Sequence, residues 1–207
     1  MVRKKNKNLK KANPSIPELN KEVSNKEVIS IVENYNFDVS NFDFAASGSA
    51  LCYEDYNVSE KINHIDGMTV EEAEHMMATK LYQNNAKVHF NHFVEKGGRF
   101  GKRIVYGGHV ISLTRALTFN GLSNAFKIIA INGGTHASPC FAGTTVFAWS
   151  TILDKIEVSD KLGALRIRSN GIGDAQAYQF QHRDANNRFD PSVLLSLDYW
   201  ALIPRKN

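Results

Sequence analysis

His89 and the glycine pair Gly107 and Gly108 are the residues of this sequence whose types and spacing could do chemistry. An imidazole gains and loses protons near neutral pH, so His89 can act as a general acid or base. The glycines stand where an apolar strand-like approach turns into a helical pattern, and backbone N–H groups at a helix start can face a negative charge. The segment between His89 and Gly107 is long enough for a loop to bring them together. The spacing predicts a base beside an oxyanion site.

Neighbouring residues could extend this site, although each also has a plain structural interpretation. His109 lies one turn inside the predicted helix and could line the same pocket or pack in the core. Lys87 and Arg103 could bind phosphates or a carboxylate, and a solvated charged loop explains them equally well. His89 itself could be a structural histidine held between two helices. These alternatives stay open at the level of sequence.

The other histidines and the two cysteines show no metal-binding pattern. Cys52 and Cys140 lie far apart, which favours neither a zinc site nor a disulfide framework and suits a reducing cytoplasm. The remaining histidines lack the spacing of metal ligands. We therefore expect no metal at any of the following residues: His64, His75, His92, His136 and His182.

A buried central helix is expected to begin near Gly107 and to end at Asn120-Gly121. Upstream, Thr69 and Glu72 have the spacing of a capping box, which predicts a second helix reaching about residue 82. Residues expected to face the core recur at helical spacing in the central helix. They are Val110, Leu113, Thr114 and Leu117, with Ile111 beside them.

Strand-like alternation dominates the chain after the central helix. One long helix followed by four or five antiparallel strands predicts an α+β domain whose sheet buries one face on that helix. The residue ranges of the expected elements are a short helix at 27–35, a first strand at 56–65 ending in the turn at 66–67, strands at 126–131, 144–156, 163–169, 175–182 and 192–203, and a hairpin loop at 184–188.

Composition points to one globular domain preceded by a basic tail. The 207 residues are 43% hydrophobic, enough for a core. Residues 1–11 hold six basic residues and no acid, so the net charge of +4 conceals a mildly acidic remainder. We expect a flexible linker over 1–24 and no nucleic-acid partner, because phosphate binding needs a basic face on the domain. No apolar stretch is long enough for a signal sequence or a membrane span, which predicts a cytoplasmic protein without a membrane partner.

Several segments resemble the MaoC-like hotdog hydratases, which add water to enoyl-CoA thioesters. Within that family, the segments look like the C-terminal half of the branch that acts on mesaconyl-CoA and β-methylmalyl-CoA. The resemblance covers roughly residues 45–205 and implies a single hotdog domain over 25–207, with an antiparallel sheet wrapped on a long central helix. It rests on residues 65–79, 81–91, 106–112 and 139–143.

The resemblance also implies roles for individual residues. The general motif of the family has an Asp five residues before its His, which places Asn84 on the Asp and His89 on the His. Gly107 falls on the glycine whose N–H binds the thioester oxygen. A neutral amide can orient water but cannot take its proton, so acid–base work is expected to rest on His89. The implied activity is hydration or dehydration of an enoyl-CoA without a metal or redox cofactor, since CoA is part of the substrate. Substrate-binding roles are expected for Gly108, His109, Lys87 and Arg103.

Partners and rival functions follow from the same resemblance. The family pairs hotdogs, and this chain matches only the second of two, so we expect a homodimer or a separately encoded first half. A thioesterase or acyl-CoA-binding hotdog would use the same oxyanion donors. A non-catalytic half that completes the active site of a partner is the remaining alternative, and the Asn84 difference favours these rivals.

Overall fold

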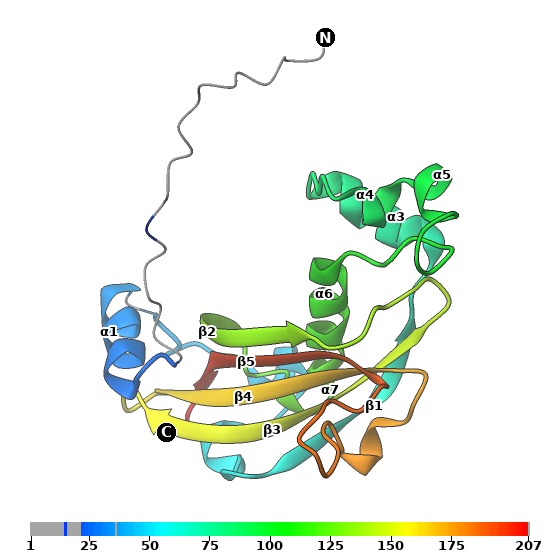
Figure 1. The fold of residues 1–207 in the computed structure, drawn as a ribbon. Coiled ribbons are helices and arrows are strands. Elements are labelled where there is room, and N and C mark those ends of the chain that lie inside the picture. Colours follow the sequence, from blue (N-terminus) through cyan, green and yellow to red (C-terminus); the bar gives the residue numbers. More distant parts are fainter. Residues whose placement is uncertain (1–14, 16–21, 36, 207) are drawn as a thin grey trace.

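A single antiparallel sheet of five strands organises the domain, in the order β1-β3-β4-β5-β2 (Figure 1). The computed structural model describes residues 15, 22–35 and 37–206, so most of the predicted basic tail at 1–24 lies outside the described residues. All neighbouring strands pair antiparallel. The strands are β1 Lys61–Thr69, β2 Lys127–His136, β3 Thr145–Glu157, β4 Leu162–Gly173 and β5 Val193–Pro204.

The central helix is α6, Gly107–Leu117, and it packs on the inner face of the sheet. It starts at the predicted glycine, and Val110, Thr114 and Leu117 are its buried residues. Val110 and Leu117 share the main core with inner-face residues of β4 and β5 such as Ile167. The predicted α+β hotdog architecture is thereby confirmed. The helix ends three residues earlier than expected, and the kinked turn α7, Phe119–Leu122, follows it.

The outer face of the sheet is covered at its two ends by different segments. Helix α1, Asn25–Tyr35, packs Val28 and Val32 beside Trp200 and Leu202, which confirms the short helix expected there. A smaller cluster at the other end holds Trp149. None of the described helices is long and apolar enough to cross a membrane. The remaining helical segments are α2 Phe44–Ser47, η1 Tyr53–Asp55, α3 Glu72–Leu81, α4 Lys87–Phe90, α5 His92–Glu95 and η2 Ala177–Gln179.

The capping box predicted at Thr69 is wrong because strand pairing takes that residue. β1 continues through the expected turn at 66–67, and a register shift between His64 and Gly67 absorbs the irregularity. Thr69 is the last residue of β1, and its hydroxyl lies 2.8 Å from the Thr145 hydroxyl on β3. Helix α3 begins at Glu72 without a side-chain cap. Sheet hydrogen bonds thus replaced the local capping that the sequence favoured.

The strand predicted at 175–182 is also wrong. This segment forms η2 and irregular backbone, and Phe180 adopts a left-handed conformation with φ of 49°. Ala177 and Phe180 pack beside Trp149 on the outer face, so the apolar residues that suggested a strand serve as a cover. The hairpin loop predicted at 184–188 is confirmed by an antiparallel bridge between Arg183 and Phe189.

Candidate active site

A cavity of about 520 Å³ lies where α6 begins and β2 ends. It brings His89 together with the glycine pair Gly107 and Gly108, from which His89 is separated in the sequence by a loop. The cavity is therefore the place where an imidazole and a helix N-terminus could act on the same molecule. Its other lining residues are Ile104, Val105, Tyr106, Val110, His136, Ala137, Ser138, Pro139 and Cys140.

Backbone contacts fix the position and the tautomer of His89. Its turn, α4, is joined to the approach of α6 by a hydrogen bond from Ile104 N to Val88 O of 3.1 Å. His89 Nδ1 lies 3.0 Å from Ile104 O. A carbonyl only accepts, so Nδ1 carries the proton and Nε2 is the basic nitrogen. Nε2 has no hydrogen-bond partner among the described residues, and the ring packs edge-on against Tyr106. This imidazole is oriented to accept a proton.

The two glycines leave the N-terminus of α6 open. The first helical N–H groups that bond back to Tyr106 O are those of His109 and Val110, so the N–H groups of Gly107 and Gly108 are not used within the helix. A Cβ on Gly108 would lie 2.6 Å from the Tyr106 ring. A side chain at this position would therefore collide with the wall of the cavity. The open N–H groups and the positive end of the helix favour a negative charge here.

His136 is a cavity residue that sequence reasoning missed. It ends β2, and a Cβ on Gly107 would lie only 2.7 Å from its Nε2. Although part of the ring is exposed, burial against the cavity walls lowers the pKa of His136. The sequence shows no metal-ligand spacing around His136 and does not single it out. The sequence carried no local signal for this position, because the strand expected at 126–131 ended before His136.

Cys140 also lines the cavity, but its thiol is not a nucleophile. Burial raises the pKa of Cys140 to about 11, so the sulfur is protonated and unreactive near neutral pH. No group of three or more His, Cys, Asp or Glu side chains in the described part of the chain could hold a metal ion. The imidazoles of His89 and His136 are therefore candidates for acid–base chemistry in this cavity.

Asn84 lies outside this cavity. It lines a neighbouring cavity of about 490 Å³ together with Phe90 and Arg103. Its side-chain oxygen accepts a hydrogen bond of 2.9 Å from Ala86 N, and its own N–H donates to Thr79 O at 3.0 Å. These bonds shape the turn between α3 and α4, which carries His89. A role for Asn84 in orienting water stays a prediction.

The remaining predicted binding residues, His109, Arg103 and Lys87, lie in three different places. His109 Nε2 lies 3.0 Å from Glu74 Oε1, which ties α6 to α3. Arg103 pairs with Glu72 and lines the second cavity, so its charge is partly compensated. Lys87 is exposed on α4. None of these three lines the cavity that holds His89, and their contacts with substrate stay predictions.

Comparison with known proteins shows close relatives over almost the whole chain, although no family model matches. β-Methylmalyl-CoA dehydratase of Chloroflexus aurantiacus is 49% identical over 208 residues, covering 100% of this chain and 58% of the relative. Mesaconyl-CoA hydratase of Cereibacter sphaeroides is 48% identical over 206 residues, covering 99% of this chain and 58% of the relative. The chain thus spans a little more than half the length of the curated relatives it matches.

Solved structures give the same assignment. A structure from Chloroflexus aurantiacus described as a MaoC domain protein dehydratase superposes with a TM-score of 0.86 at 48% identity, over 100% of this chain and 58% of that one. A Mycobacterium tuberculosis protein described as a double hotdog gives a TM-score of 0.55 at 20% identity, over 79% of this chain and 44% of that one, and supports the fold alone. Over its whole length, the chain is thus similar in sequence and in fold to MaoC-like hotdog proteins.

Proposed function

We propose that this chain is an enoyl-CoA hydratase or dehydratase acting on a branched substrate of the mesaconyl-CoA and β-methylmalyl-CoA type. The observation that carries the proposal is the single cavity that holds His89 together with the free N–H groups at the start of α6. The names of the two close relatives support the substrate class. The reaction requires a base for water and a site for an enolate oxygen, and both are available in this cavity.

In the proposed mechanism, His89 carries out the proton transfers. In hydration, His89 Nε2 takes a proton from water as the oxygen bonds to Cβ of the enoyl thioester. The double-bond electrons move to the thioester oxygen, where the N–H groups of Gly107 and Gly108 stabilise the charge. The imidazolium then returns the proton to Cα. Dehydration runs through the same steps in reverse. Neither direction requires a metal or redox cofactor.

Orientation of the imidazole is supplied by a neutral group. The Ile104 carbonyl accepts from His89 Nδ1 and holds the ring. An Asp is not needed to fix this tautomer. Because Asn84 is a neutral amide outside the cavity, His89 is the proton carrier of the proposed mechanism.

The proposed activity is tested by replacing His89. The His89→Ala variant should lose about 100-fold to 10,000-fold in the rate of mesaconyl-CoA hydration, which is the usual contribution of a general acid or base. His92→Ala is the matched control, because His92 is exposed on α5 and does not line the cavity. Loss of the enoyl absorbance measures hydration, and thiol release measures the rival thioesterase activity. Full hydratase activity in a folded His89→Ala variant, or thiol release alone in the wild type, would contradict the proposal.

We also propose that a second hotdog pairs with the free edge of β2, and that the assembly works in the cytoplasm. β2 pairs with β5 on one side only, and its Ile131 is 60% exposed. An unpaired edge with an exposed apolar residue favours association. Because β2 brings His136 into the cavity, a partner on this edge would lie close to the site. Sedimentation at micromolar concentration should show a dimer of this chain, and a stable monomer with full activity would contradict the pairing.

A further inference from the structure

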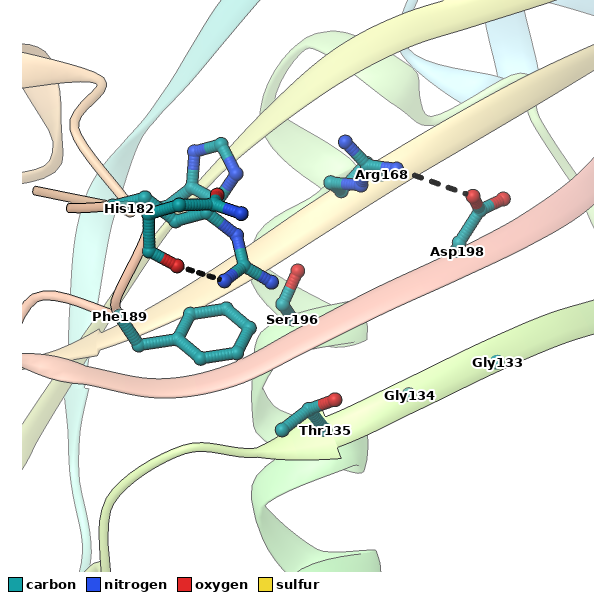
Figure 2. Close-up of a pocket in the computed structure, with 10 residues that line it drawn as sticks. Gly133, Gly134, Thr135, Arg168, His182, Phe189, Ser196 and Asp198 are labelled. Atoms are coloured by element: carbon teal, nitrogen blue, oxygen red, sulfur yellow. Dashed lines mark hydrogen bonds and ion pairs between the residues drawn. The ribbon is translucent and has the colours of Figure 1, made fainter. Parts of the chain in front are cut away.

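A third cavity, which is polar and has a volume of about 390 Å³, lies on the outer face of the sheet (Figure 2). We call it the outer cavity. It is built from β2, β4 and β5 and from the hairpin that precedes β5. The cavity occupies the part of the outer face between the α1 cluster and the Trp149 cluster. Its lining residues are Gly133, Gly134, Thr135, Arg168, His182, Arg183, Asn187, Phe189, Ser196 and Asp198.

Strand alternation separates this outer cavity from the candidate active site. Side chains of successive strand residues point to opposite faces. Leu195, Leu197 and Tyr199 of β5 belong to the core that contains α6. Ser196 and Asp198, which alternate with them, line the outer cavity. The sheet therefore lies between the two cavities, and the outer one needs its own explanation.

Positive charge prevails around the outer cavity. Arg168 and Arg183 line it. Burial, followed by the charges of Arg168, Arg183 and Lys61, lowers the pKa of His182. Asp198 is the one acidic lining residue, and it is already engaged.

The Asp198 carboxylate has little capacity left for the cations of the cavity. It accepts from Arg166 Nε at 2.9 Å and from a terminal Arg166 nitrogen at 2.8 Å. Asn132 donates to it at 2.8 Å as well. Arg168 reaches it only at 3.5 Å. The guanidinium of Arg168 is thus left with most of its donors available.

Several further donors face the cavity unused. Thr135, Ser196 and His182 line it, and their side chains have no hydrogen-bond partner among the described residues. Arg183 donates one N–H to Asn187 O at 2.7 Å. Its guanidinium carbon lies over the Phe189 ring, 3.9 Å from the ring centroid. In Figure 2, the labelled side chains of Arg168, His182, Ser196 and Phe189 surround a common space.

We propose that the outer cavity binds a phosphate-bearing small molecule through Arg168 and Arg183, with the Ser196 and Thr135 hydroxyls as additional donors. The donors come from three strands and a hairpin, so they approach from several directions, as a tetrahedral phosphate requires. Guanidinium groups match phosphate oxygens in geometry and charge. Phe189 supplies an apolar wall for the rest of the ligand. Free phosphate and a nucleotide share this chemistry and are distinguished by experiment.

Calorimetric titration of the full chain at constant ionic strength tests the site, with inorganic phosphate, ADP and citrate as probes. Constant ionic strength is required because salt screens the attraction. We expect saturable binding of phosphate or ADP. Removing a charge-assisted hydrogen bond should weaken it about tenfold or more in Arg183→Gln and in Arg168→Gln. Arg188→Gln is the matched control, because Arg188 is exposed on the same hairpin and does not line the cavity.

The affinities measured for phosphate, ADP and citrate distinguish the possible ligands. Equal affinity for phosphate and ADP identifies the phosphate group as the recognised part, and tighter ADP binding identifies a nucleotide. Either result supports the site if Arg183→Gln weakens it and Arg188→Gln does not. Absence of saturable binding, unchanged affinity in Arg183→Gln, or tighter binding of citrate than of both phosphates would overturn the proposal. Arg183 is exposed, so its replacement keeps the test valid even if Arg168→Gln fails to fold.

Discussion

His64 should make the folded protein sensitive to mild acid, because it is fully buried in a directional chain of hydrogen bonds. Its Nδ1 lies 2.6 Å from Asn120 O, so Nδ1 donates and Nε2 must accept from the Ser150 hydroxyl at 2.8 Å. Ser150, Ser169 and Tyr199 continue the chain across β3, β4 and β5, with oxygen separations of 2.8 and 3.0 Å. A proton on Nε2 would force the Ser150 hydroxyl to accept instead of donate. The folded protein therefore favours the neutral ring.

The size of the effect follows from the pKa of His64. Burial, with a contribution from the charge of Arg115, lowers this pKa from 6.5 to about 4. Above pH 6.5 the ring is neutral in both states and costs no stability. As the pH falls from 6.5 towards 4, the unfolded chain binds a proton that the folded protein does not, so the free energy of unfolding decreases. Uptake of one proton by the unfolded chain lowers the free energy of unfolding by about 1.36 kcal/mol per pH unit below pH 6.5. At pH 5 the free energy of unfolding is therefore lower by about 2 kcal/mol.

Urea unfolding at pH 7 and pH 5, followed by the fluorescence of the buried tryptophans, measures this loss. Burial also lowers the pKa of His75, His136 and His182. For that reason, the informative quantity is the difference between the wild type and His64→Gln. The variant should lose about 2 kcal/mol less than the wild type between these pH values. His92→Gln, which replaces an exposed histidine, is the control and should match the wild type. Parallel pH dependence of the wild type and His64→Gln would refute the reasoning.

Two further predictions concern the candidate active site and the thiols. Gly107→Ala puts a methyl group 2.7 Å from His136 Nε2. We expect hydratase activity to fall at least about tenfold, and an added His136→Ala change to restore part of it by freeing the space, as a double-mutant cycle would show. Equal activity in the single and double variants would rule out this contact. Burial raises the pKa of Cys52 and of Cys140 to about 11, so each thiolate fraction at pH 8 is about 100-fold below that of an ordinary thiol. Ellman's reagent should label both only after denaturation, and fast labelling of the native protein would contradict their burial.

The sequence predicted the central helix and most strands because their burial is periodic. In α6, Val110, Thr114 and Leu117 recur at helical spacing, and one face of the helix is buried accordingly. The expectations failed where two local preferences competed. Thr69 could cap a helix or end a strand. In the structure it pairs with Thr145 of β3, and it therefore ends the strand. Tertiary contacts of this kind are not encoded in the spacing of nearby residues.

The candidate site was only partly predictable for a related reason. His89 and Gly107 were placed together by the resemblance and by the types of the residues. His136 reaches Gly107 only because β2 forms the sheet edge beside the start of α6, and no short spacing in the sequence expresses that proximity. Asn84 shows the opposite case. It is close to His89 in sequence, but its side chain shapes the turn before α4 instead of entering the cavity.

Alternation along β5 explains how one sheet can serve two different cavities. Its odd-numbered residues, such as Leu197 and Tyr199, pack into the core with α6. From Ser196 onward, its even-numbered residues face outward, where Asp198 is polar and Trp200 is apolar. The change from polar to apolar on the outward face marks the place where the cover provided by α1 begins. The polar stretch that α1 does not cover is the floor of the outer cavity. A substitution at Ser196 or Asp198 can therefore alter the outer cavity while the inward residues that support α6 keep their packing.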